Sequence, residues 1–272
     1  MNKTLLSVAL LGCASTAYAA DVNQAGNLPT VLVTATRTAI TAEDALASVT
    51  IITRADIERL QPLSVSDLLT GLPGVSFANT GGYGQQTSLF LRGTNSAHTL
   101  VLIDGVRIGS VANGLAAFEQ LPVEQIERIE IVRGPRSSLY GADAIGGVIQ
   151  IFTRHGSRDG GVLPSFSVTG GSEKLWRGQL GVSGGDGDAW YNLSVGRQNT
   201  RGINSCKLGA AEALAGCFTD EPDHDGYRNQ NLAFNGGYRW NNGAQISGNW
   251  LRSVGEVHFD GSYQNRSRTL QQ

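Results

Sequence analysis

The stretch VRGPRSSLYGADAIGGVIQIF, residues 132–152, is a strand-like run that glycines interrupt. Its glycine spacing matches neither the phosphate-binding loop G-x-x-x-x-G-K-S/T nor the dinucleotide fingerprint G-x-G-x-x-G. Together with the residues just before it, the stretch predicts a strand over residues 129–132, a Gly-Pro turn, a short turn over residues 137–140 and a glycine-led strand over residues 146–152. We therefore expect no nucleotide site here.

The composition is that of an ordinary folded protein. The chain has 272 residues, enough for one or two domains, with 40% hydrophobic and 16% charged residues. Its 36 glycines are nearly twice the average share of about 7%. The net charge of −2 gives no electrostatic reason to expect nucleic acid as a partner.

The first residues, MNKTLLSVALLGCASTAYAAD, have the pattern of a secretory signal. Lys3 precedes an apolar run over residues 5–11, and Ala17-Tyr18-Ala19 forms a small-x-small cleavage site, so residues 1–19 are predicted to be a signal peptide. A lipoprotein signal ending at Cys13 is the alternative. No later run approaches the roughly 18 apolar residues that a membrane helix needs.

Two cysteines, Cys206 and Cys217, remain once the signal is removed. In an exported chain, two closely spaced thiols most simply form a disulfide. The alternative is a pair of free thiols in a loop. Residues 20–30, which follow the signal, are polar and predicted to be flexible.

The next part of the chain predicts a small α+β domain. Val31, Leu32 and Val33 form a short β-prone run that has no strand partner nearby in the sequence. Capping boxes predict the starts of two helices, and strands are predicted over residues 88–91 and 99–103. The capping pairs are Thr53 with Asp56 and Ser64 with Asp67.

From residue 163 on, alternating segments replace the helical periodicity. The five segments are PSFSVTGG, LWRGQLGVSGG, AWYNLSVGRQ, NLAFNGGYRW and AQISGNWLRS. Short turns join some of them, whereas residues 202–230 make one long connection. This pattern is typical of an outer-membrane β-barrel, and a soluble β-sandwich is the alternative. Aromatic residues stand at segment ends: Trp176, Trp190, Tyr191, Tyr238, Trp240 and Trp250.

Two long segments carry a family resemblance. LFLRGTNSAHTLVLIDGVRI and IERIEIVRGPRSSLYGADAIGGVIQIFTR resemble the plug signatures of TonB-dependent outer-membrane receptors, and PTVLVTATR resembles their TonB box. The resemblance implies an α+β plug domain over residues 37–158, followed over residues 159–272 by about five antiparallel strands that begin a 22-stranded transmembrane barrel. Five strands cannot close a barrel, so we expect the N-terminal part of a longer receptor.

The same resemblance implies partners and a location. TonB would dock on the box at residues 31–36, which includes Val31, Leu32, Val33, Thr34 and Ala35. The protein would sit among lipids of a Gram-negative outer membrane. A likeness to cobalamin receptors over residues 31–156, together with the loop DEPDHDGY, implies energy-coupled uptake of cobalamin or a related corrinoid. The alternatives are a siderophore receptor of the same family, a passive binding or adhesion protein, and a remnant that does not transport.

Ligand-binding positions follow from the resemblance alone. Two plug-apex loops would contact the corrin with small polar side chains, and the second loop is about one residue shorter than the family pattern. The implied residues are Gln86, Ser88, Asn95, Ala112 and Asn113. The plug would pair Arg92, Arg133 and Arg136 with acidic groups of the barrel wall, which would hold the plug in place or also gate it.

An acidic loop suggests calcium. Glu221, Asp223 and Asp225, followed by a glycine, match positions 1, 3, 5 and 6 of an EF-hand loop. Position 12 is Leu232 rather than Glu, so other loops would complete the site, with Asn204 and Asp260 as candidates. A solvated acidic loop is the alternative, while the resemblance to cobalamin receptors favours structural Ca²⁺.

The sequence does not predict an enzyme. The histidines are scattered, and no nucleophile elbow, H-E-x-x-H motif or paired-cysteine metal spacing accompanies them. They are His98, His155, His224 and His258.

Overall fold

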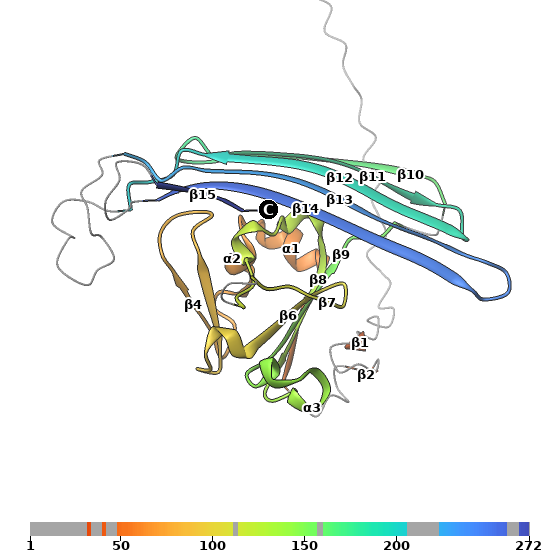
Figure 1. Ribbon diagram of the computed structural model, residues 1–272. Helices are drawn as coiled ribbons and strands as arrows, with labels where there is room; N and C mark the ends of the chain where they lie inside the picture. The colour runs from red at the N-terminus through yellow and green to blue at the C-terminus, as the bar shows by residue number, and fades with distance from the viewer. Residues whose placement is uncertain are drawn as a thin grey trace, which may run out of the picture. The chain divides into compact units, whose positions relative to one another are not determined.

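The structure is a computed structural model, shown in Figure 1. It describes residues 32–33, 40–41, 48–110, 114–156, 160–205, 223–259 and 267–271. Residues 48–156 form an α+β domain, and the described residues from 162 to 271 form one antiparallel sheet. The predicted order, a small α+β domain followed by antiparallel strands, is confirmed. The strand count of a complete barrel stays a prediction.

A five-stranded sheet forms the centre of the α+β domain. β6 pairs with β9 in parallel, and the other neighbours are antiparallel. The fully buried side chains on it include Ile129, Ile131, Ile149 and Ile151. In spatial order the strands are β3 (Val49–Ile52), β8 (Ile126–Arg133), β9 (Gly147–Thr153), β6 (Thr99–Ile103) and β7 (Val106–Arg107).

The glycines of the opening stretch allow a close backbone approach. Gly147 has φ +151°, and a Cβ there would collide with the backbone oxygen of Val132 on the neighbouring strand. Gly146 leaves no room either, because its Cβ would meet the Thr94 hydroxyl. The stretch is therefore a packing motif, in which β9 starts directly against β8.

Both predicted helices carry the predicted caps. α1 (Arg54–Leu60) has its capping box between Thr53 and Asp56, and α2 (Val65–Leu69) has one between Ser64 and Asp67. The remaining helical segments are single turns. They are η1 (Ser96–His98), η2 (Phe118–Gln120), η3 (Val123–Gln125), α3 (Ser137–Tyr140) and η4 (Ala142–Ala144). Within the described part of the chain, no helix has the length and apolar character needed to cross a membrane.

A separate hairpin extends the domain. β4 (Val75–Asn79) pairs with β5 (Thr87–Leu91) and is joined to it by the loop over residues 80–86. Leu89 and Leu91 of β5 are buried in the main core, whereas β4 is mostly exposed. The sequence analysis predicts β5 but not β4, whose Val75 and Phe77 nevertheless pack against the core.

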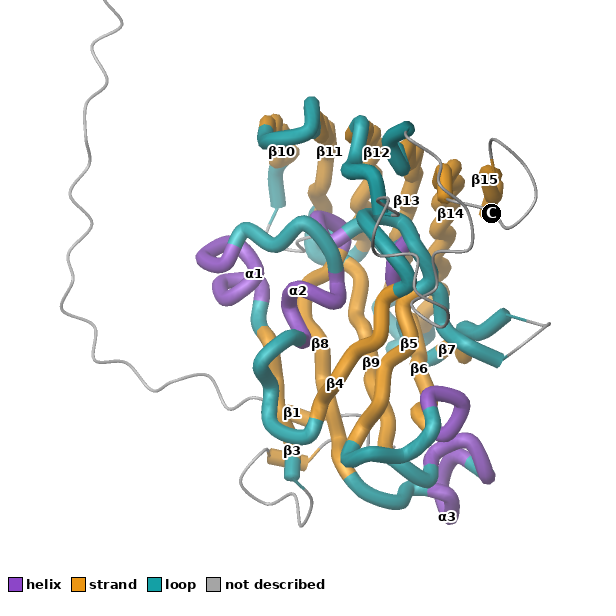
Figure 2. Tube along the Cα trace, turned by 90° about the vertical axis from the view of Figure 1, so that its left-hand side faces the viewer, coloured by secondary structure: helices purple, strands orange, loops and turns teal. Residues whose placement is uncertain are grey.

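The second sheet has six strands in sequence order, as Figure 2 shows from the side. The sequence predicts five of them, and the sixth is β15. The long connection is shorter than predicted, since β13 begins at Tyr227. The strands are β10 (Val162–Gly170), β11 (Trp176–Gly185), β12 (Ala189–Thr200), β13 (Tyr227–Arg239), β14 (Gln245–Phe259) and β15 (Ser267–Gln271).

The two faces of this sheet differ in polarity. On β12, Leu193 and Val195 are exposed on one face, whereas Ser194 and Thr200 are buried on the other. This is the alternation of a barrel wall, with apolar side chains outward and polar side chains toward the lumen. Trp190 stands at the start of β12, where an aromatic segment end is predicted, but it is 6% exposed and packs over Gly237 on the inner face.

Candidate functional site

The turn η2 ties the α+β domain to the six-stranded sheet. The Tyr227 hydroxyl lies 3.0 Å from the backbone oxygen of Glu119 and 3.2 Å from Oε1 of Gln120. Asn229 Nδ2 donates to the same Oε1 at 3.2 Å, and the Ser253 hydroxyl donates to the Gln120 backbone oxygen at 2.6 Å. Gln120 thus accepts hydrogen bonds from both β13 and β14.

The loop over residues 80–86 meets the same two strands. Gly84 lies against the ring of Tyr227 so closely that a Cβ would overlap it, and its φ of +79° also favours glycine. Gln85 Nε2 donates to the backbone oxygen of His258 at 2.8 Å. Because Tyr227 directly follows the acidic loop DEPDHDG, this contact links that loop to the hairpin loop of the domain.

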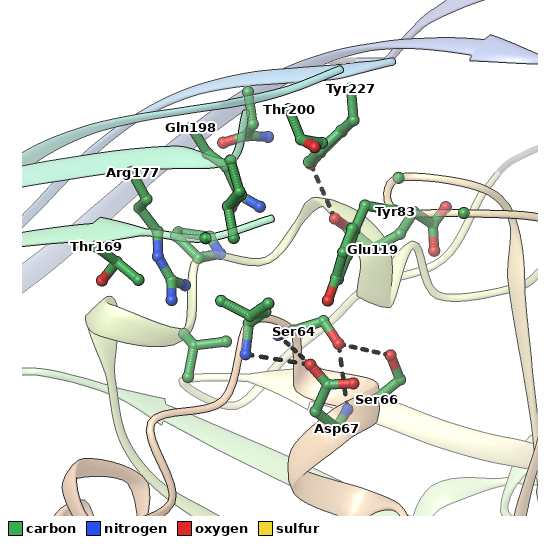
Figure 3. A pocket seen from close by; sticks show the side chains of 18 of the residues that line it. Ser64, Ser66, Asp67, Tyr83, Glu119, Thr169, Arg177, Gln198, Thr200 and Tyr227 are labelled. Carbon is green, nitrogen blue, oxygen red and sulfur yellow. Dashed lines mark hydrogen bonds between the residues drawn. The ribbon is translucent and has the colours of Figure 1, made fainter. Parts of the chain in front are cut away.

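A cavity of about 650 Å³ lies beside these contacts, between α2, residues 81–84, η2 and η3 on one side and β10 to β13 on the other. Figure 3 shows Tyr83, Glu119 and Arg177 on its walls. Arg177 of β11 forms a 2.5 Å ion pair with Glu124 and donates to the Pro62 backbone oxygen at 3.2 Å. The walls combine apolar side chains such as Phe77 and Leu175 with charged and polar ones, so the cavity is amphipathic.

Glu119 is the most perturbed carboxyl group of this cavity. Burial raises its pKa to about 7, against a smaller opposing effect of hydrogen bonds from the backbone N–H groups of Glu119 and Thr87. Its Oε2 atom is buried and has no hydrogen-bond partner. The side chain is therefore poised to change its charge near neutral pH.

Further polar contacts join the two sheets. They differ from the predicted ion pairs because each donor is a side-chain amide and no arginine side chain takes part. The donor and acceptor pairs are Gln125 Nε2 to Asn231 Oδ1 at 2.7 Å, Asn192 Nδ2 to the Arg154 backbone oxygen at 2.7 Å, and Asn249 Nδ2 to Asp104 Oδ2 at 2.8 Å.

The three predicted arginines lie elsewhere. Arg133 donates to the Pro73 backbone oxygen at 2.8 Å and to the Thr50 hydroxyl at 2.7 Å, both within the α+β domain. Burial and the neighbouring Arg92 lower the pKa of Arg133. Arg136 reaches only the backbone oxygen of the adjacent proline. Among the described residues none of the three pairs with a carboxylate of the sheet, and the polarity is reversed: Arg177 belongs to the sheet and Glu124 to the domain.

The three predicted ligand residues that the structure describes do not form one cluster. Gln86 is exposed and is the last residue of the loop over residues 80–86, just before β5. Ser88 is half-buried within the strand. Asn95 follows the far end of β5 and caps η1, so it lies about a strand length from Gln86. Ala112 and Asn113 fall outside the described residues.

The predicted metal residues are only partly described. Asp225 is 2% exposed, and its Oδ2 accepts a hydrogen bond from the Ser205 backbone N–H at 2.8 Å. This brings Asp225 beside the segment that contains Asn204. Glu221, Asp260, Cys206 and Cys217 lie outside the described residues, whereas Asp223 lies within them. Within the described ranges, no group of three or more His, Cys, Asp or Glu side chains is arranged to hold a metal.

The predicted docking strand has a partner. β1 (Leu32–Val33) pairs antiparallel with β2 (Ile40–Thr41), so the expectation of an unpaired strand is wrong. The partner is only seven residues further along the chain, at a register of Val33 with Ile40. Val31, Thr34 and Ala35 lie outside the described residues.

Comparisons with known proteins agree on one family. Residues 41–148 match the TonB-dependent receptor plug domain. The vitamin B12 transporter BtuB of Photobacterium profundum is 36% identical over 266 residues, which are 97% of this chain and 41% of the relative. BtuB of Vibrio cholerae serotype O1 is 34% identical over 269 residues, which are 98% of this chain and 42% of the relative. The chain thus spans about two fifths of the length of these curated relatives.

Solved structures show the same fold at lower identity. The pyoverdine outer membrane receptor FpvA of Pseudomonas aeruginosa aligns with a TM-score of 0.66 and 16% identity, over 84% of this chain and 30% of that one. A mutant of the ferric enterobactin receptor PfeA from Pseudomonas aeruginosa, in complex with enterobactin, aligns with a TM-score of 0.57 and 22% identity, over 78% and 33%. These structural similarities support the fold and nothing more specific.

Proposed function

Because this chain belongs to the TonB-dependent receptors, we propose that it forms the plug and the first barrel strands of an outer-membrane receptor for cobalamin or a related corrinoid. The observation that carries this proposal is the identity of 34–36% to vitamin B12 transporters over 97–98% of the chain. Uptake would be energy-coupled, with TonB as the periplasmic partner. The receptor would recognise and move its ligand rather than transform it chemically.

A ferric siderophore is the second candidate ligand. The solved neighbours include receptors for ferric enterobactin and pyoverdine, which favours this reading at the level of the fold. Their identities of 16–22% are well below those of the vitamin B12 transporters. The higher identity, which extends through the strands after the plug, therefore supports a corrinoid.

The contacts between plug and sheet suit a plug that shifts during transport. Among the described residues, most of them are hydrogen bonds from amides and hydroxyls to Gln120, Asp104 and backbone oxygens, with one ion pair and the apolar contact of Leu251. Water can replace such partners at small net cost, because a hydrogen bond contributes only about 0.5–1.5 kcal/mol net. An apolar interface of the same area would resist movement far more strongly.

Docking would use the segment around β1. TonB would bind it by adding a strand, a mode in which backbone hydrogen bonds provide the affinity. Since β1 already pairs with β2, TonB must either displace β2 or add to the free edge of β1. Residues Leu32 and Val33 would supply the backbone groups.

Calcium binding would belong to the outer loop of the receptor. The contact of Asp225 with the Ser205 N–H brings the two ends of this loop together, which supports a site that also uses Asp223, Glu221 and Asn204. The ion would offset the mutual repulsion of the carboxylates and part of the entropy lost on ordering the loop. A disulfide between the loop cysteines would restrict the loop further.

Ligand binding to the complete receptor tests the proposal. We expect saturable binding of cyanocobalamin to purified receptor, with ferric enterobactin as the matched control. Binding of the iron chelate and not of cobalamin would replace the corrinoid with a siderophore. Binding of neither ligand by folded receptor would contradict both assignments.

A further inference from the structure

A groove of about 800 Å³ crosses the outer face of the six-stranded sheet, on the side away from the plug. It runs over β10 to β14, and the Trp176 side chain lies over Gly178 at one side of it. Phe166 and Val168 on its floor are 83% and 73% exposed. The apolar floor consists of Phe166, Val168, Leu180, Val195, Leu232 and Val254.

Two arginines line this apolar groove. Arg197 lies opposite Gln230, which lies opposite Val254, and Arg252 is two residues from Val254 along β14. Strand spacing and rise place the two arginine Cα atoms about 12 Å apart. Both side chains are exposed, and among the residues described neither forms an ion pair with a carboxylate.

On three adjacent strands, the outward side chains change from apolar to polar close to the two arginines. On β12 the outward side chains change from apolar at Val195 to charged at Arg197. On β13 they change from Leu232 to Gln230. On β14 they change from Val254 to Glu256, and Arg252 lies one step inside this boundary, level with Leu232. The polar side of the boundary is the end from which the long loop leaves, and long loops of such barrels are extracellular. The boundary therefore corresponds to the level of the outer headgroups.

We propose that this groove binds a phosphorylated acyl lipid of the outer leaflet. The phosphate lies between Arg197 and Arg252, and an acyl chain covers the apolar floor. Guanidinium groups form paired, charge-assisted hydrogen bonds with phosphate. A zwitterionic headgroup accepts such hydrogen bonds less favourably, because its own cation offsets the phosphate charge. The inference rests on the outer-membrane location proposed above and extends it from general lipid contact to one defined site.

Lipid titration of the complete receptor in detergent tests this site. Native mass spectrometry would measure the binding of phosphatidic acid, with phosphatidylcholine and inorganic phosphate as the two comparison ligands. We expect phosphatidic acid to bind best, with affinity falling about fivefold in Arg197→Gln or Arg252→Gln and about thirtyfold in the double variant. Arg228→Gln is the matched control, because Arg228 is exposed on the same face, bonds to Asn199 and lies outside the groove.

Three outcomes would overturn the proposal. If phosphatidylcholine binds as tightly as phosphatidic acid, the groove is only an apolar surface. If inorganic phosphate binds as tightly, the groove is an anion site that does not recognise a lipid. If the receptor forms dimers that dissociate in the double variant, the occupant of the groove is a second copy of the receptor. Cobalamin binding is measured on the same samples: if it persists while lipid selectivity is absent, only the groove proposal fails. If the receptor does not insert into bilayers, the proposed function fails first.

Discussion

The five-stranded sheet of the plug and the six-stranded sheet beside it bury opposite kinds of side chain. The plug sheet buries Ile129, Ile131 and Ile149 completely, so its stability comes from apolar packing. The six-stranded sheet buries Ser194 and Asn229 toward the plug and exposes Leu180 and Phe166 outward. The plug thus has a core of its own, and replaceable polar contacts dominate its boundary with the barrel wall, where Leu251 adds an apolar contact.

The largest expected effect concerns the plug core. Ile149→Ala should lower the free energy of plug unfolding by about 2–5 kcal/mol, since it leaves a cavity in a fully buried layer. Hydrogen exchange of the β9 amides in the complete receptor would measure it. Leu180→Ala, on the outer face, is the control and should leave this exchange unchanged. Equal effects of the two substitutions would remove the contrast between the sheets.

The interface itself should respond less. Gln120→Ala leaves Tyr227 and Asn229 without their shared acceptor and should weaken plug docking by about 2–3 kcal/mol. Urea extraction of the plug from the barrel, followed by site-directed spin labels, would report the change. Gln86→Ala is a matched control in an exposed position. A plug core destabilised by Gln120→Ala would show that this contact belongs to folding rather than to docking.

The smallest expected effect depends on pH. The folded pKa of Glu119 is raised from 4.5 to about 7, so the folded state binds the proton more tightly than the unfolded state. Stability from this group is fully present below pH 4.5 and is lost as pH rises toward 7. Glu119→Gln should flatten this dependence, which amounts to roughly 2 kcal/mol after allowance for partial exposure. An unchanged pH profile of plug extraction in the variant would place the titration elsewhere.

Local features of the plug could be predicted from sequence. The capping boxes at Thr53 and Ser64 depend on residues three positions apart, and β6 matches its predicted bounds. The family signatures also identified the domain. The β4 strand is not predicted, although its Val75 and Phe77 pack against the core, because the strand has only five residues; the pairing of β1 with β2 is not predicted because each strand has two residues.

Contacts between distant residues could not be predicted in this way. The hydrogen bond of Tyr227 to Gln120 joins residues 107 positions apart. The sequence around either residue does not identify the other residue as its partner. The predicted pairing of the plug arginines with the barrel wall stays a prediction, while within the described residues Arg133 donates to Pro73 and Thr50. Polar residues alternating along β12 and β13 were the available signal for the interface, but they do not identify partners.

Uptake of labelled cobalamin in cells that carry Val33→Pro in the complete receptor tests the central claim most directly. Proline removes an N–H and fixes φ, so it should block strand pairing at the docking segment. We predict that uptake falls to the level of cells without TonB, while surface affinity for cobalamin stays within a factor of about three. Val33→Ala, which keeps the N–H, should transport normally. Normal uptake by the proline variant, or a parallel loss of binding and uptake, would contradict the account.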